Sequence, residues 1–413
     1  QGNNLFRTDT IKENPEIEKI DFDLVVGNPP FGTKNLSRSI RDYSDKYGFA
    51  KEMVLPFLHK ATKLSANGEI ALIFNTKVLT NTNGKYQSFR EWLFNECYVE
   101  KIYNFSILRK VPEDFGGQLF GSATGPISII FYRKNAPKKK SDTIIYYAPK
   151  TYIKSNVIEG VSIDSTDLKY LPREECQKPS TKIWKVAMWG GMSDFDIIKR
   201  ISKKTVSMET FLKNTENGWD LPRAGLNGDR EHLDFIPEQV INSRYIQRFY
   251  TPSDALQKNE KYFRNIDKNL FEPPFVLFKK GQKNRKLTAS YIDYFAYCTT
   301  ACYVFSGNVE SDEKKALTAI FNSKITTYIL FMVSSSWGIE REQIFMDEVM
   351  DIPAIINLLN QENLSKIVGH FDEIMSGIKS DFLKKDYSQL EEKIDKVILK
   401  DVLGMTDREL VII

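Results

Sequence analysis

The fold is decided by Phe22-Asp23-Leu24-Val25-Val26-Gly27-Asn28-Pro29-Pro30-Phe31-Gly32. Its short apolar run ends in a turn signal, which is the pattern of a strand buried on both faces of a parallel sheet. Such a strand delivers Asn28 to its carboxyl end, where ligands bind in open α/β sheets. The alternative is a Pro-Pro turn that happens to follow a strand, since proline fixes φ and turns are common there. The stretch therefore predicts a strand followed directly by a candidate site.

Strand and helix patterns alternate downstream of this stretch. An amphipathic helix over residues 49–64 and a buried-type strand over 69–74 predict one βαβ crossover. A further helix and two further strands are predicted over 86–95, 98–105 and 126–132. The alternation predicts a doubly wound, Rossmann-like α/β sheet that is incomplete, because such a domain usually begins with further β-α units. Since the chain starts at Gln1, we expect those units upstream or on another chain.

The rest of the chain divides into three parts. Short strand-like pieces that alternate with Ser, Thr and Pro are typical of a connector. Strand patterns at 275–278 and 303–305, with a helical pattern at 314–333, predict an α+β domain, and apolar residues at helical spacing predict C-terminal helices. The expected division is 1–140 for the doubly wound domain, 141–185 for the connector, 186–353 for the α+β domain and 354–413 for the helical segment.

The composition is that of a globular protein. Apolar residues make up 41% of the 413 residues and charged residues 27%, which excludes disordered and fibrous classes. The net charge is +4, from 58 basic and 54 acidic side chains, so an anionic partner must meet a local patch. Many of the 27 Phe and 19 Tyr lie among Lys and Arg in the second half. That mixture suits base stacking beside phosphate contacts, with an ordinary core role as the alternative.

The cysteines and histidines do not form a metal-binding pattern. Cys298 and Cys302 are four residues apart, but no His lies near them. We therefore expect neither a disulfide framework nor a metal site. No run of ~18 apolar residues exists to span a membrane, and the N-terminal residues lack a signal pattern. We expect a soluble, cytoplasmic protein with no membrane partner.

The residue types from Asn28 to Phe31 suit the activation of an amine. The lone pair of an exocyclic amine on a base is delocalised into the ring, so the nitrogen is a poor nucleophile until acceptors polarise its N–H bonds. Asn28 offers a side-chain carbonyl and Pro29 a backbone carbonyl, and the rigidity of Pro29 and Pro30 holds both acceptors in place. Phe31 would stack on the base, which must leave a duplex to reach such a pocket.

The stretch from Asp23 to Gly32 resembles the catalytic motif of the N6-adenine-specific DNA methyltransferases of restriction-modification systems. Asn-Pro-Pro-Phe or Asn-Pro-Pro-Tyr is characteristic of that family. The resemblance implies that S-adenosylmethionine donates a methyl group directly to the N6 amine of a flipped adenine. It also implies catalytic roles for Asn28, Pro29, Pro30 and Phe31, in the C-terminal part of a methyltransferase catalytic domain. The sequence has no Pro-Cys dipeptide, which cytosine ring-carbon methylation would require.

A second base-stacking residue is implied at Phe120. This residue precedes the strand at 126–132 by a short loop, similar to the aromatic residue that packs on the opposite face of the flipped base in the family. Phe115 is the rival candidate, and a core or loop role for Phe120 is the alternative.

Cofactor contacts are implied at Asn3 and Asn28. Gly2-Asn3-Asn4-Leu5 resembles the family segment in which Gly-Asp contacts the adenine of the cofactor, with Asn3 in place of Asp and Asp9 as an alternative. The family's glycine-rich cofactor loop has no counterpart in this sequence. We therefore expect the isolated chain to bind S-adenosylmethionine poorly or not at all, and to be inactive alone.

The second half resembles the target-recognition domain of the family. The matching segments occur in the expected order at 273–281, 319–324, 334–339 and 402–409. A basic cluster in this half suits DNA phosphates, although such a run is usually a solvated loop. Its members are Lys279, Lys280, Lys283, Arg285 and Lys286, and further candidates for DNA contact are Arg223, Arg244, Arg248 and Trp337.

The sequence therefore predicts a site-specific DNA methyltransferase, or a fragment of one, from a restriction-modification or related defence system. Its partners would be double-stranded DNA and an upstream domain or another subunit. The main alternative is a non-catalytic DNA-recognition subunit or fragment whose cofactor-binding part is supplied upstream or by another chain. A third reading is an RNA or protein amide methyltransferase, because Asn-Pro-Pro also suits glutamine or guanine amines.

Overall fold

The computed structural model contains two compact units, Gln1–Phe195 and Asp196–Ile413. The division falls inside helix α8 (Met192–Lys204), so the chain passes from one unit to the other within a helix. The described residues are 7–106, 125–154, 157–162, 165–228, 235–264, 267–282, 285–335, 337–338, 342–381 and 386–413.

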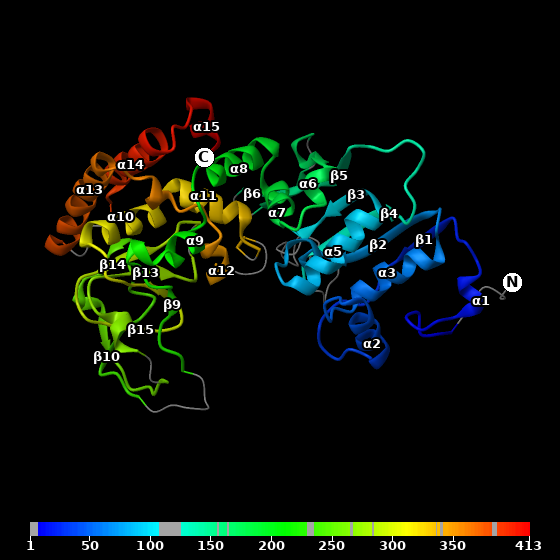
Figure 1. Ribbon diagram of the computed structural model, residues 1–413, viewed down its shortest axis with the longest axis horizontal. Coiled ribbons are helices and arrows are strands. Elements are labelled where there is room, and N and C mark those ends of the chain that lie inside the picture. Colours follow the sequence, from blue (N-terminus) through cyan, green and yellow to red (C-terminus); the bar gives the residue numbers. More distant parts are fainter. Residues whose placement is uncertain are drawn as a thin grey trace. The chain divides into compact units, whose positions relative to one another are not determined.

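A six-stranded mixed sheet forms the first unit, with the strand order β1-β2-β4-β3-β5-β8 (Figure 1). β1 is parallel to β2, and β2 and β3 are both antiparallel to β4, so β1, β2 and β3 run in the same direction. β5 is parallel to β3, and β8 is antiparallel to β5. The strands are β1 (Leu24–Gly27), β2 (Glu69–Asn75), β3 (Tyr98–Asn104), β4 (Ile127–Arg133), β5 (Thr143–Tyr147) and β8 (Leu168–Pro172).

Helices connect and cover these strands. α3 lies between β1 and β2 in the chain, which confirms the predicted βαβ crossover. Two strands, β6 (Lys150–Lys154) and β7 (Val157–Ser162), form a separate antiparallel pair. The helices are α1 (Pro15–Glu18), α2 (Arg38–Tyr47), α3 (Val54–Leu64), α4 (Lys77–Thr80), α5 (Gly84–Glu96), α6 (Arg173–Cys176) and α7 (Lys182–Trp189).

The core of this unit lies on one face of the sheet. Side chains of a strand alternate between faces, and on β2 every second one, Ile70, Leu72 and Phe74, is buried. α3 and α5 pack across this face (Figure 1), with Leu58 and Phe89 in the same cluster. Full burial of each such side chain stabilises the fold by roughly 1.5–3 kcal/mol.

The strand that was predicted to be buried on both faces, β1, lies at the edge of the described sheet. Val25 packs against the core, but Leu24 is 57% exposed and Val26 is 67% exposed. The prediction of two-sided burial is wrong for the described chain, because β2 is the one described strand that pairs with β1 and no described element covers its outer face.

The region predicted as a connector, 141–185, contributes to this sheet. It supplies β5 and β8, and Ile144, Tyr146 and Leu171 are buried in the core. Buried and half-buried residues alternate along β5, so the strand has one fully buried face.

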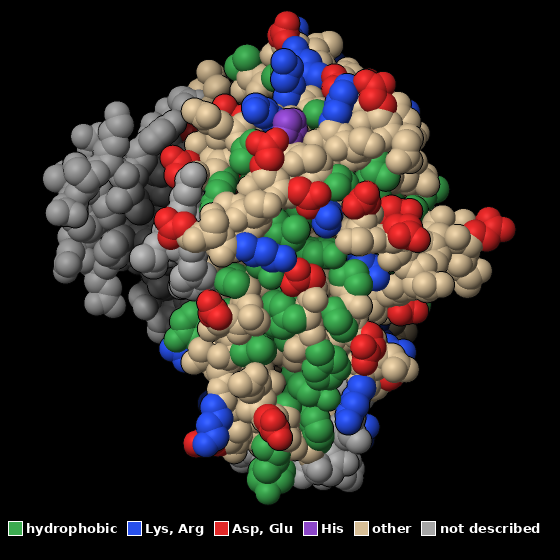
Figure 2. All heavy atoms as spheres, turned by 90° about the vertical axis from the view of Figure 1, so that its left-hand side faces the viewer, with side chains coloured by type: hydrophobic (Ala, Val, Ile, Leu, Met, Phe, Trp, Pro, Cys, Tyr) green, Lys and Arg blue, Asp and Glu red, His purple; other side chains and the backbone are tan. Residues whose placement is uncertain are grey.

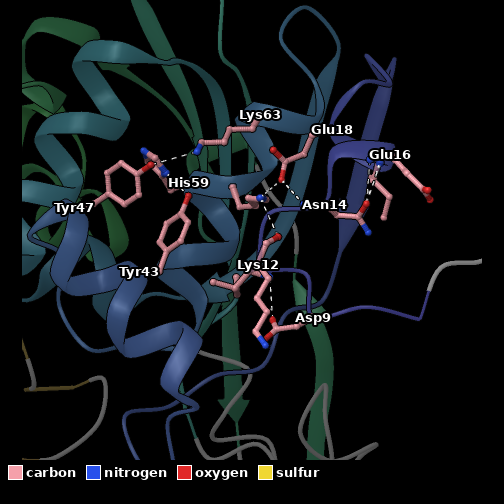
Figure 3. A network of polar contacts seen from close by, with 12 residues as sticks. Asp9, Lys12, Asn14, Glu16, Glu18, Tyr43, Tyr47, His59 and Lys63 are labelled. Carbon is pink, nitrogen blue, oxygen red and sulfur yellow. Dashed lines mark hydrogen bonds and ion pairs between the residues drawn. The ribbon is translucent and has the colours of Figure 1, made fainter.

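A polar network joins the N-terminal segment to α2 and α3 (Figure 3). Lys60 is buried, forms an ion pair with Glu18 and donates a hydrogen bond to the backbone carbonyl of Lys12. A hydrogen bond of 2.7 Å joins the Tyr43 hydroxyl to Nδ1 of His59. The network therefore fixes residues 12–18 against α3.

The second unit contains two sheets. The larger has the order β11-β14-β13-β16-β9, and the smaller β12-β10-β15. The predicted strands at 275–278 and 303–305 are confirmed as β13 and β16. The strands are β9 (Arg223–Ala224), β10 (Gln239–Ile241), β11 (Phe249–Tyr250), β12 (Leu256–Lys258), β13 (Phe275–Lys279), β14 (Ala289–Ile292), β15 (Tyr297–Cys298) and β16 (Cys302–Phe305).

Helices complete this unit, and its C-terminal helices confirm the predicted helical pattern. They are α9 (Met208–Lys213), α10 (Ser311–Asn322), α11 (Lys324–Val333), α12 (Met346–Met350), α13 (Gln361–Ser380), α14 (Ser388–Lys396) and α15 (Asp407–Ile412). The architecture confirms the predicted α/β fold class, in which a sheet of this kind is followed by an α+β unit with C-terminal helices.

One predicted helix, over 314–333, is in fact two. Ser323 has extended backbone angles, with φ −68° and ψ 156°, and separates α10 from α11. Its hydroxyl accepts a hydrogen bond from the backbone N–H of Thr326, so it caps the second helix. The apolar periodicity continues across the break, and this is why the sequence predicted one helix.

No single helix in the described ranges is long and apolar enough to cross a membrane. α10 and α11 meet the length and composition criteria only as a pair, and the pair is bent by 56°.

Candidate active site

The candidate active site lies at the carboxyl edge of the first sheet. Because β1, β2 and β3 run in the same direction, their last residues meet at one edge. Asn28 follows β1, Asn75 ends β2 and Asn104 ends β3. The topology therefore gathers three amide side chains where open α/β sheets bind ligands.

Asn28 to Phe31 form the turn that leaves β1. Asn28 and Pro30 are exposed, Pro29 is buried, and Phe31 is half-buried against the core cluster. The packing of Phe31 fixes one end of the turn, while the amide of Asn28 stays open to a ligand.

Gly32, directly after Phe31, is held through both of its backbone groups. Its N–H donates to Oε1 of Glu52 at 2.7 Å, and its carbonyl accepts from the N–H of Met53 at 3.0 Å. Its φ is +116°, in the region that favours glycine, so a side chain here would strain the turn. The exit of the turn is therefore fixed to the residues that precede α3.

Glu52 is the centre of a small buried network. Glu52 is 1% exposed, and its carboxylate binds two groups besides the N–H of Gly32. Oε2 accepts a hydrogen bond of 2.9 Å from the Tyr86 hydroxyl and lies 3.4 Å from Nζ of Lys77. Lys77 begins α4, just after β2, and also lies over the ring of Tyr86. A buried carboxylate needs such partners, because burial without them is costly.

A second polar network lies beneath the same edge. The Ser106 hydroxyl donates to Oγ1 of Thr76 at 2.8 Å, and Thr76 is 2.7 Å from the hydroxyl of Ser128. Asn104 donates from its amide to the Tyr146 hydroxyl at 2.6 Å. Burial raises the pKa of Tyr146, so this phenol keeps its proton. These bonds fix the ends of β2, β3 and β4.

Several predicted site residues lie outside the described residues. They are Asn3, Phe120, the rival Phe115, and Lys283. The alternative cofactor residue, Asp9, is described. It accepts hydrogen bonds from the Ser39 hydroxyl at 2.8 Å and from the N–H of Ile11 at 3.1 Å, and the bond from Ser39 lowers its pKa. The carboxylate of Asp9 is therefore already hydrogen-bonded to other residues of the first unit.

Two residues predicted to contact DNA, Arg223 and Lys279 of the basic cluster, lie in one sheet of the second unit. Arg223 on β9 pairs opposite Val304, and Lys279 on β13 pairs opposite Cys302, both on β16. Arg223 and Arg285 are exposed, and Lys279 and Lys280 are half-buried.

Two of these cations, Lys280 and Arg285, lie over aromatic rings. Nζ of Lys280 lies 6.0 Å from the ring centre of Tyr303 and 5.8 Å from that of Phe345. The guanidinium of Arg285 lies 5.6 Å from the ring centre of Phe331. Both geometries are within the range of a cation–π contact.

Two predicted DNA contacts are core residues instead. Trp337 is 0% exposed, and its ring packs edge-on against Phe331. Arg248 donates to the carbonyls of Leu287 and Asn322 and forms an ion pair with Glu391. The side chain of Trp337 is packed in the core and that of Arg248 is hydrogen-bonded within the protein, so neither is available to contact a duplex in this structure.

The charge on the face drawn in Figure 2 is mixed. Lys and Arg side chains alternate there with Asp and Glu, and hydrophobic side chains gather in its lower half. The exposed large hydrophobic residues of the second unit include Ile236, Tyr262 and Phe295. No single basic field covers this face, in line with a net charge of only +4.

No set of three or more His, Cys, Asp and Glu side chains in the described ranges is placed to hold a metal ion. Cys298 and Cys302 are free and buried.

Glu52, Lys77 and Tyr86 were not predicted. They come from three different segments, and each has an ordinary sequence context. Only the pairing of β1 with β2 and the packing of α5 bring them to the turn after Phe31.

Comparison with known proteins finds a family similar to the segment that carries this site. Residues 1–111, which include β1, its turn and Glu52, match the model of the Eco57I restriction-modification methylase family. This part of the chain is therefore similar to restriction-modification methylases. It is 21% identical over 397 residues to a Methanocaldococcus jannaschii protein whose assigned name is that of a type II restriction enzyme and methyltransferase. The alignment covers 92% of this chain but 31% of that relative, so the chain spans about a third of its length.

A solved structure with a similar fold is that of MmeI, a Type IIL restriction-modification enzyme in complex with DNA. The TM-score is 0.53 at 12% identity, over 94% of this chain and 55% of that one. The similarity extends through both units and is a similarity of fold.

Proposed function

We propose that this chain carries the amine-activating centre and the DNA-recognition part of a methyltransferase that modifies the N6 amine of adenine in duplex DNA. The observation that carries the proposal is the turn at the carboxyl end of β1. Asn28 is exposed there, Pro29 and Pro30 stiffen the backbone, and Phe31 is half-buried beside them. This set offers two carbonyl acceptors and one ring at a single strand end.

The acceptors would act on the two N–H bonds of the target amine. The side-chain oxygen of Asn28 accepts one and the backbone carbonyl of Pro29 accepts the other. Both bonds draw the amine out of conjugation with the ring, which makes its lone pair available for attack. Because proline fixes φ, little ordering of the turn is needed when the base arrives.

Phe31 would hold the base. Stacking on an aromatic side chain is worth about 1–3 kcal/mol per base, which offsets part of the cost of flipping the base out of the duplex. The face of Phe31 that does not pack against the core is the surface for this contact.

S-adenosylmethionine supplies the methyl group in this chemistry when it is bound. The described chain does not offer it a complete site, because none of the described strands of the first sheet is followed by a Gly-x-Gly turn. The open edge of β1, with Leu24 and Val26 exposed, is where a further strand would fit. We place the cofactor-binding part there, in the same protein or on another chain.

Contacts with DNA phosphates are assigned to the second unit. Arg223, Lys279, Lys280 and Arg285 supply positive charge from one sheet and the loop after β13. Phosphate contacts of this kind set the register of a protein on a duplex but carry no sequence information directly.

The test is transfer of labelled methyl from S-adenosylmethionine to mixed-sequence duplex DNA by the full-length protein, followed by identification of the methylated base. Asn28→Ala should lower the rate by at least about 100-fold, as loss of one catalytic hydrogen-bonding group does elsewhere. The matched control is Asn67→Ala. Asn67 is an exposed asparagine that lies just before the first residue of β2, at the end of the strand away from the site, so this variant should retain the rate. Label on cytosine, or full activity of Asn28→Ala, would refute the proposal.

A further inference from the structure

The carboxylate of Glu52 is the group through which the turn after β1 is fixed to the rest of the first unit. It is buried, and it binds the backbone N–H of Gly32, one residue beyond Phe31, at 2.7 Å. The N–H of Met53, the next residue, returns a hydrogen bond of 3.0 Å to the carbonyl of Gly32. Two hydrogen bonds from the one residue Gly32 to the adjacent residues Glu52 and Met53 define both the position and the direction of the backbone there.

The charge of Glu52 is balanced by a lysine that follows the neighbouring strand β2. Lys77 lies 3.4 Å away and follows β2, the strand that pairs with β1. Its side chain is 32% exposed, whereas that of Glu52 is 1% exposed. Tyr86, on α5, donates its hydroxyl to the same oxygen at 2.9 Å. The carboxylate therefore joins the turn after β1, the turn after β2 and helix α5.

We infer that Glu52 is a positioning residue for methyl transfer, which holds the carbonyls of Asn28 and Pro29 and the ring of Phe31 in the geometry that receives the base. This inference rests on the proposed function. Phe31 packs against the core on one side, and Gly32 is anchored by Glu52 on the other, so the turn is fixed at its end by two independent contacts. Glu52 does not touch the base; it acts through the backbone.

The geometry also explains why a carboxylate suits this position. A single group must accept from a backbone N–H, a phenol and an ammonium that come from three directions, and two oxygens with about four lone pairs can do so. A glutamine keeps an acceptor oxygen for Gly32, but its NH2 group faces the ammonium of Lys77. Glu52→Gln should therefore keep the turn largely in place, whereas Glu52→Ala should release it.

The test compares Glu52→Ala, Glu52→Gln and a control, Asp395→Asn, in the full-length protein. Asp395 is also a buried carboxylate that accepts a backbone N–H, from Lys324 at 2.8 Å, but it lies in the second unit. Steady-state methyl transfer should show a fall in kcat on the order of 100-fold for Glu52→Ala, with KM for DNA unchanged, since a displaced catalytic group costs about this much. Glu52→Gln should stay within about tenfold of the unmodified protein, and Asp395→Asn should keep the same kcat per folded molecule.

Hydrogen exchange provides a readout that does not need activity. Exchange of the backbone amides of Gly32 and Met53 should be faster in Glu52→Ala and unchanged in Asp395→Asn. Exchange rates that are equal in all variants, or a Glu52→Ala protein with full kcat while Asn28→Ala is inactive, would overturn the positioning role alone. If the unmodified protein transfers no methyl group, the proposed function fails, and the exchange of Gly32 still decides whether Glu52 fixes the turn.

Discussion

The imidazole of His59 should make the first unit sensitive to acid. Burial lowers the pKa of His59 to about 4, and the nearby ammonium groups of Lys63 and Lys134 add to this effect. The residue is 8% exposed, and its ring is surrounded by Tyr43, Tyr47 and other aromatic rings (Figure 3). At neutral pH, Nδ1 of the uncharged ring shares a hydrogen bond with the Tyr43 hydroxyl, whose own pKa is raised by burial. Protonation would place a positive charge on this buried ring, which burial disfavours.

The direction and size of the effect follow from the pKa of His59. An unfolded chain takes up the proton near pH 6.5, whereas the folded chain does so only near 4, so the free energy of unfolding decreases as the pH falls between these values. The full shift corresponds to about 3 kcal/mol, of which about 2 kcal/mol would be lost by pH 5. Solvent reaches part of the ring and screens the effect, so we expect a loss of about 1–2 kcal/mol between pH 7 and pH 5.

The assay is denaturant unfolding of the chain at pH 7 and pH 5, together with the same measurement on His59→Phe. The phenylalanine ring fills a similar space among the aromatic rings but cannot be protonated, so the variant should lose this part of the pH dependence. NMR titration of the imidazole should give a pKa near 4 for the signal that disappears in His59→Phe. A pKa near 6.5 for that signal, or equal pH dependence in both proteins, would refute the reasoning.

Three further predictions concern the second unit. Burial raises the pKa of Asp395 to about 6, so the free energy of unfolding should fall as the pH rises from about 4 to 6; Asp395→Asn should abolish this slope in denaturation curves. Trp337→Ala should destabilise this unit by about 3–5 kcal/mol in thermal or denaturant unfolding, while the DNA affinity of the folded fraction stays unchanged. Weaker DNA binding at constant stability would instead show that Trp337 contacts DNA. Arg223→Ala should weaken binding to all duplex sequences alike and reduce the slope of log affinity against log salt by roughly 0.9, as binding titrations at several salt concentrations would show; an unchanged slope would exclude a phosphate contact.

The turn after β1 could be predicted from sequence because its signals are local. The apolar run of Leu24 to Val26 predicts a strand, and Asn28 with two prolines predicts a rigid polar turn at its end. Both depend on neighbours in the chain, so no tertiary contact is needed to read them. The position of the strand within the sheet could not be predicted in this way, because two-sided burial depends on which elements pair with β1 and cover it.

The support of that turn and the surface of the second unit could not be predicted in the same way. Glu52 gains its role from contacts with Gly32, Lys77 and Tyr86, which packing brings together from separate segments. Trp337 follows three serines in the sequence, yet its side chain is buried in the core. Whether an aromatic or charged side chain is exposed depends on the tertiary fold, and the local sequence carries little information on it.

The exposed edge of β1 limits how the protein can vary. If a strand of the cofactor-binding part pairs there, both parts share one hydrogen-bonded ladder, and side chains on β1 alternate between faces. A shift of one residue would turn Val25 away from the core and place Leu24 and Val26 against it. Exchanges of cofactor-binding parts between relatives should therefore succeed when the spacing to Asn28 is kept, and insertions of a single residue within β1 should not be tolerated.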